Sequence, residues 1–153
     1  MITKFDVSPF DGLLPIRLGM SAAEMAAVLG VSPGRPLKTA FGFELNFILP
    51  GSQLVKATIS DDKAVEITIS PGPIPVLFES VKLLESGMER EALAVLLQKQ
   101  ADPRESYGTL IFDRLGIAVG GLHDEDIENK SLSVFARGHW RNIADLPFAD
   151  LRV

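Results

Sequence analysis

The sequence predicts an α+β fold, a tandem repeat of one helix plus antiparallel strands, with the two helices packed on one face of an antiparallel sheet. Two short phrases of similar sequence, at residues 16–24 and 81–89, each read as an extended segment followed by a helix start. Strand patterns follow each expected helix. Residues 70–75 contain three prolines and a glycine, which do not fit inside a helix or a central strand. We therefore expect one domain of two repeats, at about residues 1–72 and 73–153.

The repeated phrase reads as β-branched residue, cation, Leu, two residues, Ser, two residues, Glu. Its copies begin at Ile16 and Val81. Each ends in Ser-x-x-Glu, the pattern of a helix capping box. If Gly19 is aligned with Gly87 instead, the two copies are separated by more residues, and the apolar positions of the two predicted helices correspond better. The register of the repeat stays open between these two alignments.

In the first half, residues 1–15 are strand-like and then irregular. Ser21 is expected to begin a helix that ends near Leu29, with Gly30 following in the left-handed conformation. Residues 41–49 alternate between apolar and mostly polar positions, which predicts a strand whose Phe41, Phe43 and Phe47 face meets a helix. Residues 54–59 and 65–69 predict two more strands, joined by a hairpin turn at residues 60–63.

The second half has the same predicted order of elements. Residues 86–100 carry an apolar stripe and predict a longer helix, which Asp102 and Pro103 end. Residues 107–112, 117–119 and 132–137 predict three strands. Because such strands have one polar face, the sheet needs cover on only its other face. The two amphipathic helices are expected to provide that cover.

Composition limits the classes of function. The net charge of −5 disfavours a general nucleic-acid binder, which needs a basic surface. The chain has no cysteine, so disulfides and thiol chemistry are excluded. Its N-terminus lacks the apolar region of a signal peptide, and it has no apolar run long enough to span a membrane. We therefore expect a cytoplasmic protein without membrane association.

The first helix region resembles a known family. Gly19-Met20-Ser21, then Glu24 and Met25, and then Leu29-Gly30 are similar to the opening of the β-lactamase inhibitor protein-like fold, and of the small lipoprotein of the outer-membrane assembly machinery. The specific part of the resemblance is confined to this opening. It implies a protein-binding scaffold built from tandem repeats, such as a bacterial immunity or inhibitor-type protein. Members of that family are exported and its inhibitors carry disulfides, and this chain has neither a signal peptide nor a cysteine.

His123 and the carboxylates of residues 124–128 form the densest polar cluster. A histidine beside carboxylates is able to bind a divalent metal. The segment lacks an EF-hand glycine and has no second histidine nearby. We therefore interpret it as a solvated acidic loop between strands and predict no metal site.

Residues 137–141 carry the only tryptophan. Arg137, His139, Trp140 and Arg141 combine cations with an aromatic ring, a combination enriched at protein interfaces. The alternative is that Trp140 closes one end of the core while the arginines extend past it to water. We assign these four residues as candidate partner-binding residues.

The leading hypothesis is a non-catalytic binding protein that presents a sheet face and adjoining loops to a basic protein partner. We predict no catalytic residues and no cofactor, because two histidines without a thiol provide little for nucleophilic catalysis. A second hypothesis is a small-ligand protein or enzyme with a site near His123 and His139. A third is a structural domain that forms a homodimer through strand edges.

Overall fold

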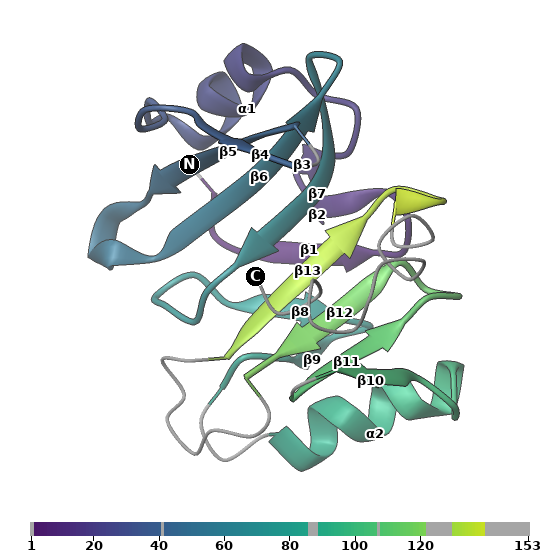
Figure 1. The fold of residues 1–153 in the computed structure, drawn as a ribbon. Coiled ribbons are helices and arrows are strands. Elements are labelled where there is room, and N and C mark those ends of the chain that lie inside the picture. Colours follow the sequence, from purple (N-terminus) through teal and green to yellow (C-terminus); the bar gives the residue numbers. More distant parts are fainter. Residues whose placement is uncertain (1, 41, 86–88, 107, 122–129, 140–153) are drawn as a thin grey trace.

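The computed structural model describes residues 2–40, 42–85, 89–106, 108–121 and 130–139. In these residues the chain forms two α-helices and two sheets, whose strands pair mostly in antiparallel fashion (Figure 1). The predicted α+β class is therefore confirmed. Within the same residues, neither helix has the length and apolar character needed to cross a membrane.

The larger sheet has eight strands in the order β10-β11-β12-β13-β7-β6-β5-β4, and every neighbouring pair is antiparallel. Strands from the two halves of the chain meet at its centre, where β7 pairs with β13. Their bounds are β4 (Leu37–Thr39), β5 (Gly42–Ile48), β6 (Leu54–Ser60), β7 (Lys63–Ile69), β10 (Arg104–Ser106), β11 (Thr109–Phe112), β12 (Ile117–Gly120) and β13 (Ser131–Phe135). The strands predicted from residues 41–49, 54–59, 65–69, 107–112, 117–119 and 132–137 correspond to β5, β6, β7, β11, β12 and β13.

A second sheet lies behind the first in Figure 1, and the sequence did not predict it. Its order is β3-β2-β1-β8-β9, and β1 pairs with β8 in parallel. The strands are β1 (Phe5–Ser8), β2 (Gly12–Leu14), β3 (Ile16–Arg17), β8 (Val76–Phe78) and β9 (Val81–Lys82). The prediction of a single antiparallel sheet is therefore wrong. Four of these five strands have only two or three residues, too few to show a period-two pattern. The strand-like residues 1–15 and the extended segments at Ile16 and Val81 did not indicate that these strands pair with one another.

The helices are α1 (Ala22–Leu29) and α2 (Glu89–Lys99), at opposite ends of the molecule in Figure 1. Helix α1 confirms the predicted boundaries. The Ser21 hydroxyl accepts from the Glu24 N–H, the Glu24 carboxylate accepts from the Ser21 N–H, and Gly30 follows with φ of 71°. Glycine adopts this left-handed conformation without a Cβ penalty. The predicted cap Ser86 and the alternative alignment through Gly87 lie outside the described residues.

The core lies between the two sheets. Ile67, Ile69, Leu132 and Val134 alternate along β7 and β13, and all four are fully buried. They belong to one hydrophobic cluster with Phe5, Leu13, Ile16 and Phe78 of the smaller sheet and with Met25 of α1 and Leu96 of α2. Phe47 of β5 is fully buried in the same hydrophobic cluster, whereas Phe43 is half-exposed near the start of the strand. Phe41 lies outside the described residues.

Both edges of the larger sheet end in a short strand that follows a proline. Pro36 precedes β4 and Pro103 precedes β10. The middle residues of these strands, Lys38 and Glu105, are charged and exposed. Short edge strands, prolines and charged side chains all hinder pairing with another chain. These features weigh against the homodimer through strand edges.

The proline-rich segment between β7 and β8 is fixed by one buried glutamine. Gln53 is 1% exposed, and its Nε2 donates to the carbonyl oxygens of Ser70 and Ile74 at 3.1 and 3.0 Å. Its Oε1 accepts from the Ile74 N–H at 3.0 Å. One side chain therefore satisfies three backbone groups of a segment whose prolines cannot donate.

Replacing this glutamine tests its contribution to stability. We expect Gln53→Leu to lower the free energy of unfolding by about 2–4 kcal/mol, because it leaves three backbone groups unpaired. Urea unfolding followed by circular dichroism measures the change. Gln98→Leu on the exposed side of α2 is the control, with little expected effect. Equal losses in the two variants would contradict this assignment.

Candidate functional site

The segment that follows β13 carries two of the predicted partner-binding residues. The Ala136 N–H donates to the Val65 carbonyl at 2.8 Å, which continues the pairing of β13 with β7 by one residue. The His139 N–H then donates to the Ala136 carbonyl at 3.1 Å and closes a turn. The turn places Arg137 and His139 beside strands of the first half of the chain.

An open groove of about 600 Å³ lies between this turn and the first half of the larger sheet. Small residues leave much of the space, and Arg137 and His139 supply large polar side chains. Among the described residues, those that line the groove are Ala40, Gly42, Ser60, Val65, Ala136, Arg137, Gly138 and His139. Gly42 is required here, because its φ is 137° and a Cβ would lie 2.1 Å from the Ile59 carbonyl oxygen.

His139 is held against β7 by a carboxylate. Its Nε2 lies 3.0 Å from Glu66 Oε1, with the ring N–H donating to the carboxylate. The two side chains are 11% and 16% exposed. A hydrogen bond to an ionised group that is shielded from water is stronger than one on the surface. The pair therefore fixes the orientation of the imidazole at the groove.

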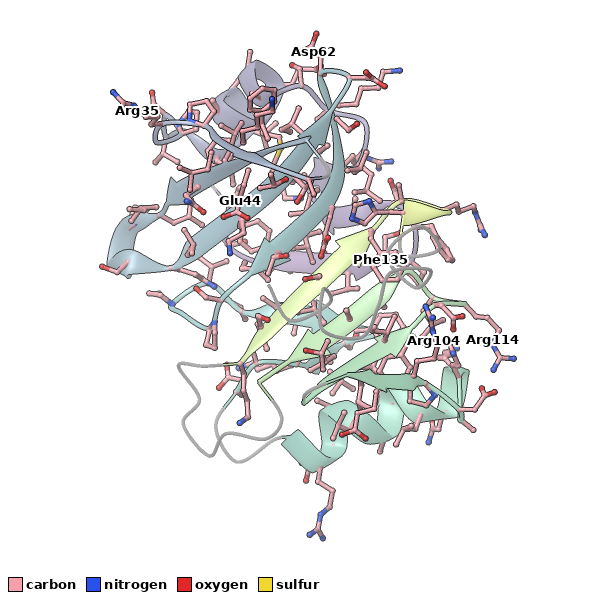
Figure 2. All side chains as sticks on the ribbon, in the orientation of Figure 1. Arg35, Glu44, Asp62, Arg104, Arg114 and Phe135 are labelled. Atoms are coloured by element: carbon pink, nitrogen blue, oxygen red, sulfur yellow. The ribbon has the colours of Figure 1, made fainter. Side chains whose placement is uncertain are left out.

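Arg137 is held by an aromatic ring from the other sheet. Its Cζ lies 4.0 Å from the centre of the Phe10 ring, in the turn between β1 and β2. Phe10 in turn packs edge-on against Phe135, with ring centres 6.3 Å apart at 88° (Phe135 is labelled in Figure 2). Phe135 is buried with Ile111 and Ala118 in a small second cluster. Arg137 therefore contacts a ring that is itself packed against buried apolar residues.

The outward face of β5, β6 and β7 is polar. Glu44 and Lys56 form an ion pair at 3.7 Å on this face, and the Thr68 and Ser133 hydroxyls are hydrogen-bonded at 2.7 Å where β7 meets β13. The exposed apolar residues here include Ile48 of β5, which is 66% exposed, and Leu37 of the neighbouring strand β4, which is 51% exposed. This face has the mixed polar and apolar character common on protein-binding surfaces.

The structure brings together two of the four predicted partner-binding residues, Arg137 and His139. Trp140 and Arg141 lie outside the described residues, as does the loop that contains His123. Sequence reasoning missed Glu66 and Phe10. Glu66 read only as a polar position of a strand, and Phe10 lay in a segment interpreted as irregular, so neither carried a signal that linked it to residues 137–139.

Chemically, the groove offers a guanidinium, an imidazole–carboxylate pair and the Ser60 hydroxyl. These groups are suited to binding polar groups of a ligand. The part of the chain that the structure describes contains no cluster of three or more histidine, aspartate or glutamate side chains able to hold a metal ion.

Comparison of this chain with family models, with curated proteins and with solved structures finds no match. The site is therefore interpreted from its own geometry.

A double-mutant cycle tests the Glu66–His139 pair. We expect Glu66→Gln, His139→Ala and the double variant to show a coupling free energy of about 1–2 kcal/mol, because the contact is largely shielded from water. Urea unfolding gives each free energy. The matched cycle on Lys4 and Asp6, whose side chains are 56% and 46% exposed, should give less than about 0.5 kcal/mol. Equal coupling in the two cycles would show that the Glu66–His139 contact has no special strength.

Proposed function

We propose that this protein is a non-catalytic protein-binding scaffold whose docking site is the groove beside residues 136–139. The observation that carries the proposal is the open groove itself, with Arg137 and His139 on one side and small residues on the other. Arginine is one of the residue types enriched among those that dominate binding energy at protein interfaces. Trp140 and Arg141 follow directly in the sequence and stay predicted parts of the same surface.

The outward face of β5 to β7 is the proposed extension of the docking site. The exposed Ile48 and the neighbouring Leu37 of β4 offer apolar contact, and the Glu44–Lys56 pair offers polar contact. The net charge of −5 suits a basic partner, because opposite charge raises the rate of encounter. We place the protein in the cytoplasm, as the sequence predicts.

The proposal includes an origin by duplication. The strand order of the larger sheet supports it, because β4 to β7 and β10 to β13 run from opposite edges to the central pair. The first residue of β10 follows that of β4 by the same number of residues as the first residue of β11 follows that of β5. Pro103 follows Pro36 by this same number of residues. The predicted extended segments at Ile16 and Val81 fall in β3 and β9.

Both helices are proposed to cover the same face of the larger sheet. In support, α1 lies next to β3 and α2 next to β9, at the two ends of the smaller sheet. Together with the duplication, this arrangement is compatible with the β-lactamase inhibitor protein-like resemblance. An immunity or inhibitor-type role is the form of binding that the resemblance implies.

A small-ligand site is the second candidate, and one observation favours it. The Glu66–His139 pair resembles the arrangement in which a carboxylate orients an imidazole for proton transfer. The predicted partner in that site, His123, lies outside the described residues. An enzyme would show turnover that Glu66→Gln reduces, whereas a scaffold would not.

Capture of a partner tests the proposed function. The tagged protein is incubated with a lysate of its native organism, and bound proteins are identified by mass spectrometry. Wild type and Arg35→Ala should retain the same partner, whereas Arg137→Ala and Ser60→Gln should each weaken its binding by about ten-fold. Arg35 is an exposed arginine away from the groove (Figure 2).

The purified partner is then titrated by isothermal calorimetry against each variant. Equal affinity for wild type and both groove variants would place the docking site elsewhere. A partner that binds only through the edges β4 or β10 would likewise contradict the proposal.

A further inference from the structure

Arg137 differs from Arg17 and Arg114 in how its side chain is held. Arg17 pairs with Asp11 and Arg114 pairs with Asp102. Within the described part of the chain Arg137 forms no ion pair and rests instead on the Phe10 ring, 4.0 Å from its centre. Its charge is therefore oriented without being neutralised by a carboxylate of those residues.

The contact with Phe10 leaves the hydrogen-bond donors of Arg137 available. Its Cζ lies over the Phe10 ring, and within the described residues its N–H groups form no hydrogen bond or ion pair. These donors match the two oxygens of a carboxylate in a bidentate pair. A stacked arginine also loses less side-chain entropy on binding, because part of its freedom is already lost.

The structure keeps Phe10 in place against a local cost. Phe10 has φ of 58°, a left-handed conformation that bulky side chains rarely adopt. Gly116 makes room for the ring, because a Cβ there would lie 2.6 Å from Phe10 Cδ1. Strained residues that surrounding packing holds in place concentrate at functional sites. This strain is a second observation, independent of the stacking contact, that points to the same place.

The groove lies next to this guanidinium. Arg137 and His139 both line it, so a chain segment lying in the groove has an oriented cation at its side. Glu66, which is not among the described lining residues, is hydrogen-bonded to His139, and its side chain is 16% exposed. The described residues that line the groove therefore include the cation of Arg137 and no carboxylate.

We propose that Arg137, positioned by Phe10, is a receptor for a carboxylate of a bound partner segment. The proposed carboxylate is an acidic side chain of that segment, and binding of a C-terminal carboxylate in its place is the outcome that the test distinguishes. The inference rests on the proposed function and deepens it, because it names the chemistry at the docking contact. The long-range attraction of a basic partner by the net charge of −5 and a short-range carboxylate contact act at different distances and are compatible.

Short peptides test this without the partner. The probes are acetyl-Gly-Glu-Gly amide, acetyl-Gly-Gly-Gly with a free carboxylate, and acetyl-Gly-Gln-Gly amide as the uncharged control. Each is titrated at millimolar concentration while the arginine Nε–H signals are followed by NMR. We expect the Arg137 signal to shift saturably with a carboxylate peptide and not with the glutamine peptide. Comparison of the first two probes shows which carboxylate source is preferred.

Variants separate positioning from general charge. Arg137→Gln should weaken carboxylate binding by about ten-fold or more, and Phe10→Leu by about two- to five-fold. Phe10→Tyr keeps the ring and should retain wild-type affinity. Arg35→Gln removes an equally exposed arginine that no ring holds, and should leave binding unchanged. The Arg137 Nε–H heteronuclear NOE should fall in Phe10→Leu and stay high in Phe10→Tyr, a change that a loss of stability alone does not produce.

Three results would overturn the inference. They are equal weakening by Arg35→Gln and Arg137→Gln, an equal response to the glutamine peptide, and wild-type affinity in Phe10→Leu. The proposed function is judged separately by partner capture. The protein could bind a partner through Arg137 and Ser60 and yet not bind carboxylate peptides. That result would support the scaffold role and contradict only the carboxylate contact.

Discussion

The antiparallel pairing of β7 with β13 is the interaction on which the rest of the structure depends. It joins the two four-stranded halves of the larger sheet, with Ile67 opposite Val134 and Ile69 opposite Leu132. These side chains are fully buried against the smaller sheet, and each contributes about 1.5–3 kcal/mol by leaving water. The same register carries the chain past Phe135 to Val65 and so fixes where Arg137 and His139 lie. Fold and candidate site therefore share one determinant.

The sequence predicted correctly those elements that depend on neighbouring residues, such as a helix start and a tight turn. The pattern of Ser21 and Glu24 predicted a capping box at the start of α1, and the structure contains that capping box. The hairpin at residues 60–63 was predicted from its aspartates, and Asp61 and Asp62 adopt the left-handed conformations that such turns require. The smaller sheet escaped prediction because its strands are short and because β1 pairs with β8 from the other half of the chain. Pairing of that kind is decided by burial in the assembled core and leaves no local pattern.

The residues of the candidate site also fall into those that the sequence indicated and those that it did not. Arg137 and His139 were predicted from composition, because cations near an aromatic residue are informative in themselves. Their partners were not, since Phe10 and Glu66 come from a turn of the smaller sheet and from the central strand. Each contact joins residues that lie far apart in the sequence. No local pattern in the sequence relates such positions. The register of β7 and β13 brings Glu66 to His139, and the packing of the smaller sheet against β13 brings Phe10 to Arg137.

The edges and the groove together indicate where a partner is able to bind. Pro36 and Pro103 stand before the two edge strands, so main-chain pairing with another protein is hindered at both ends of the larger sheet. The proposed recognition of a partner therefore relies on side chains on a face or in the groove, and not on main-chain pairing at the edges. At the groove, Phe10 is held in a left-handed conformation, and Gly42 and Gly138 line the open space together with Arg137 and His139. The proposed binding role would use these features together, since Phe10 contacts Arg137 and the two glycines leave room next to it.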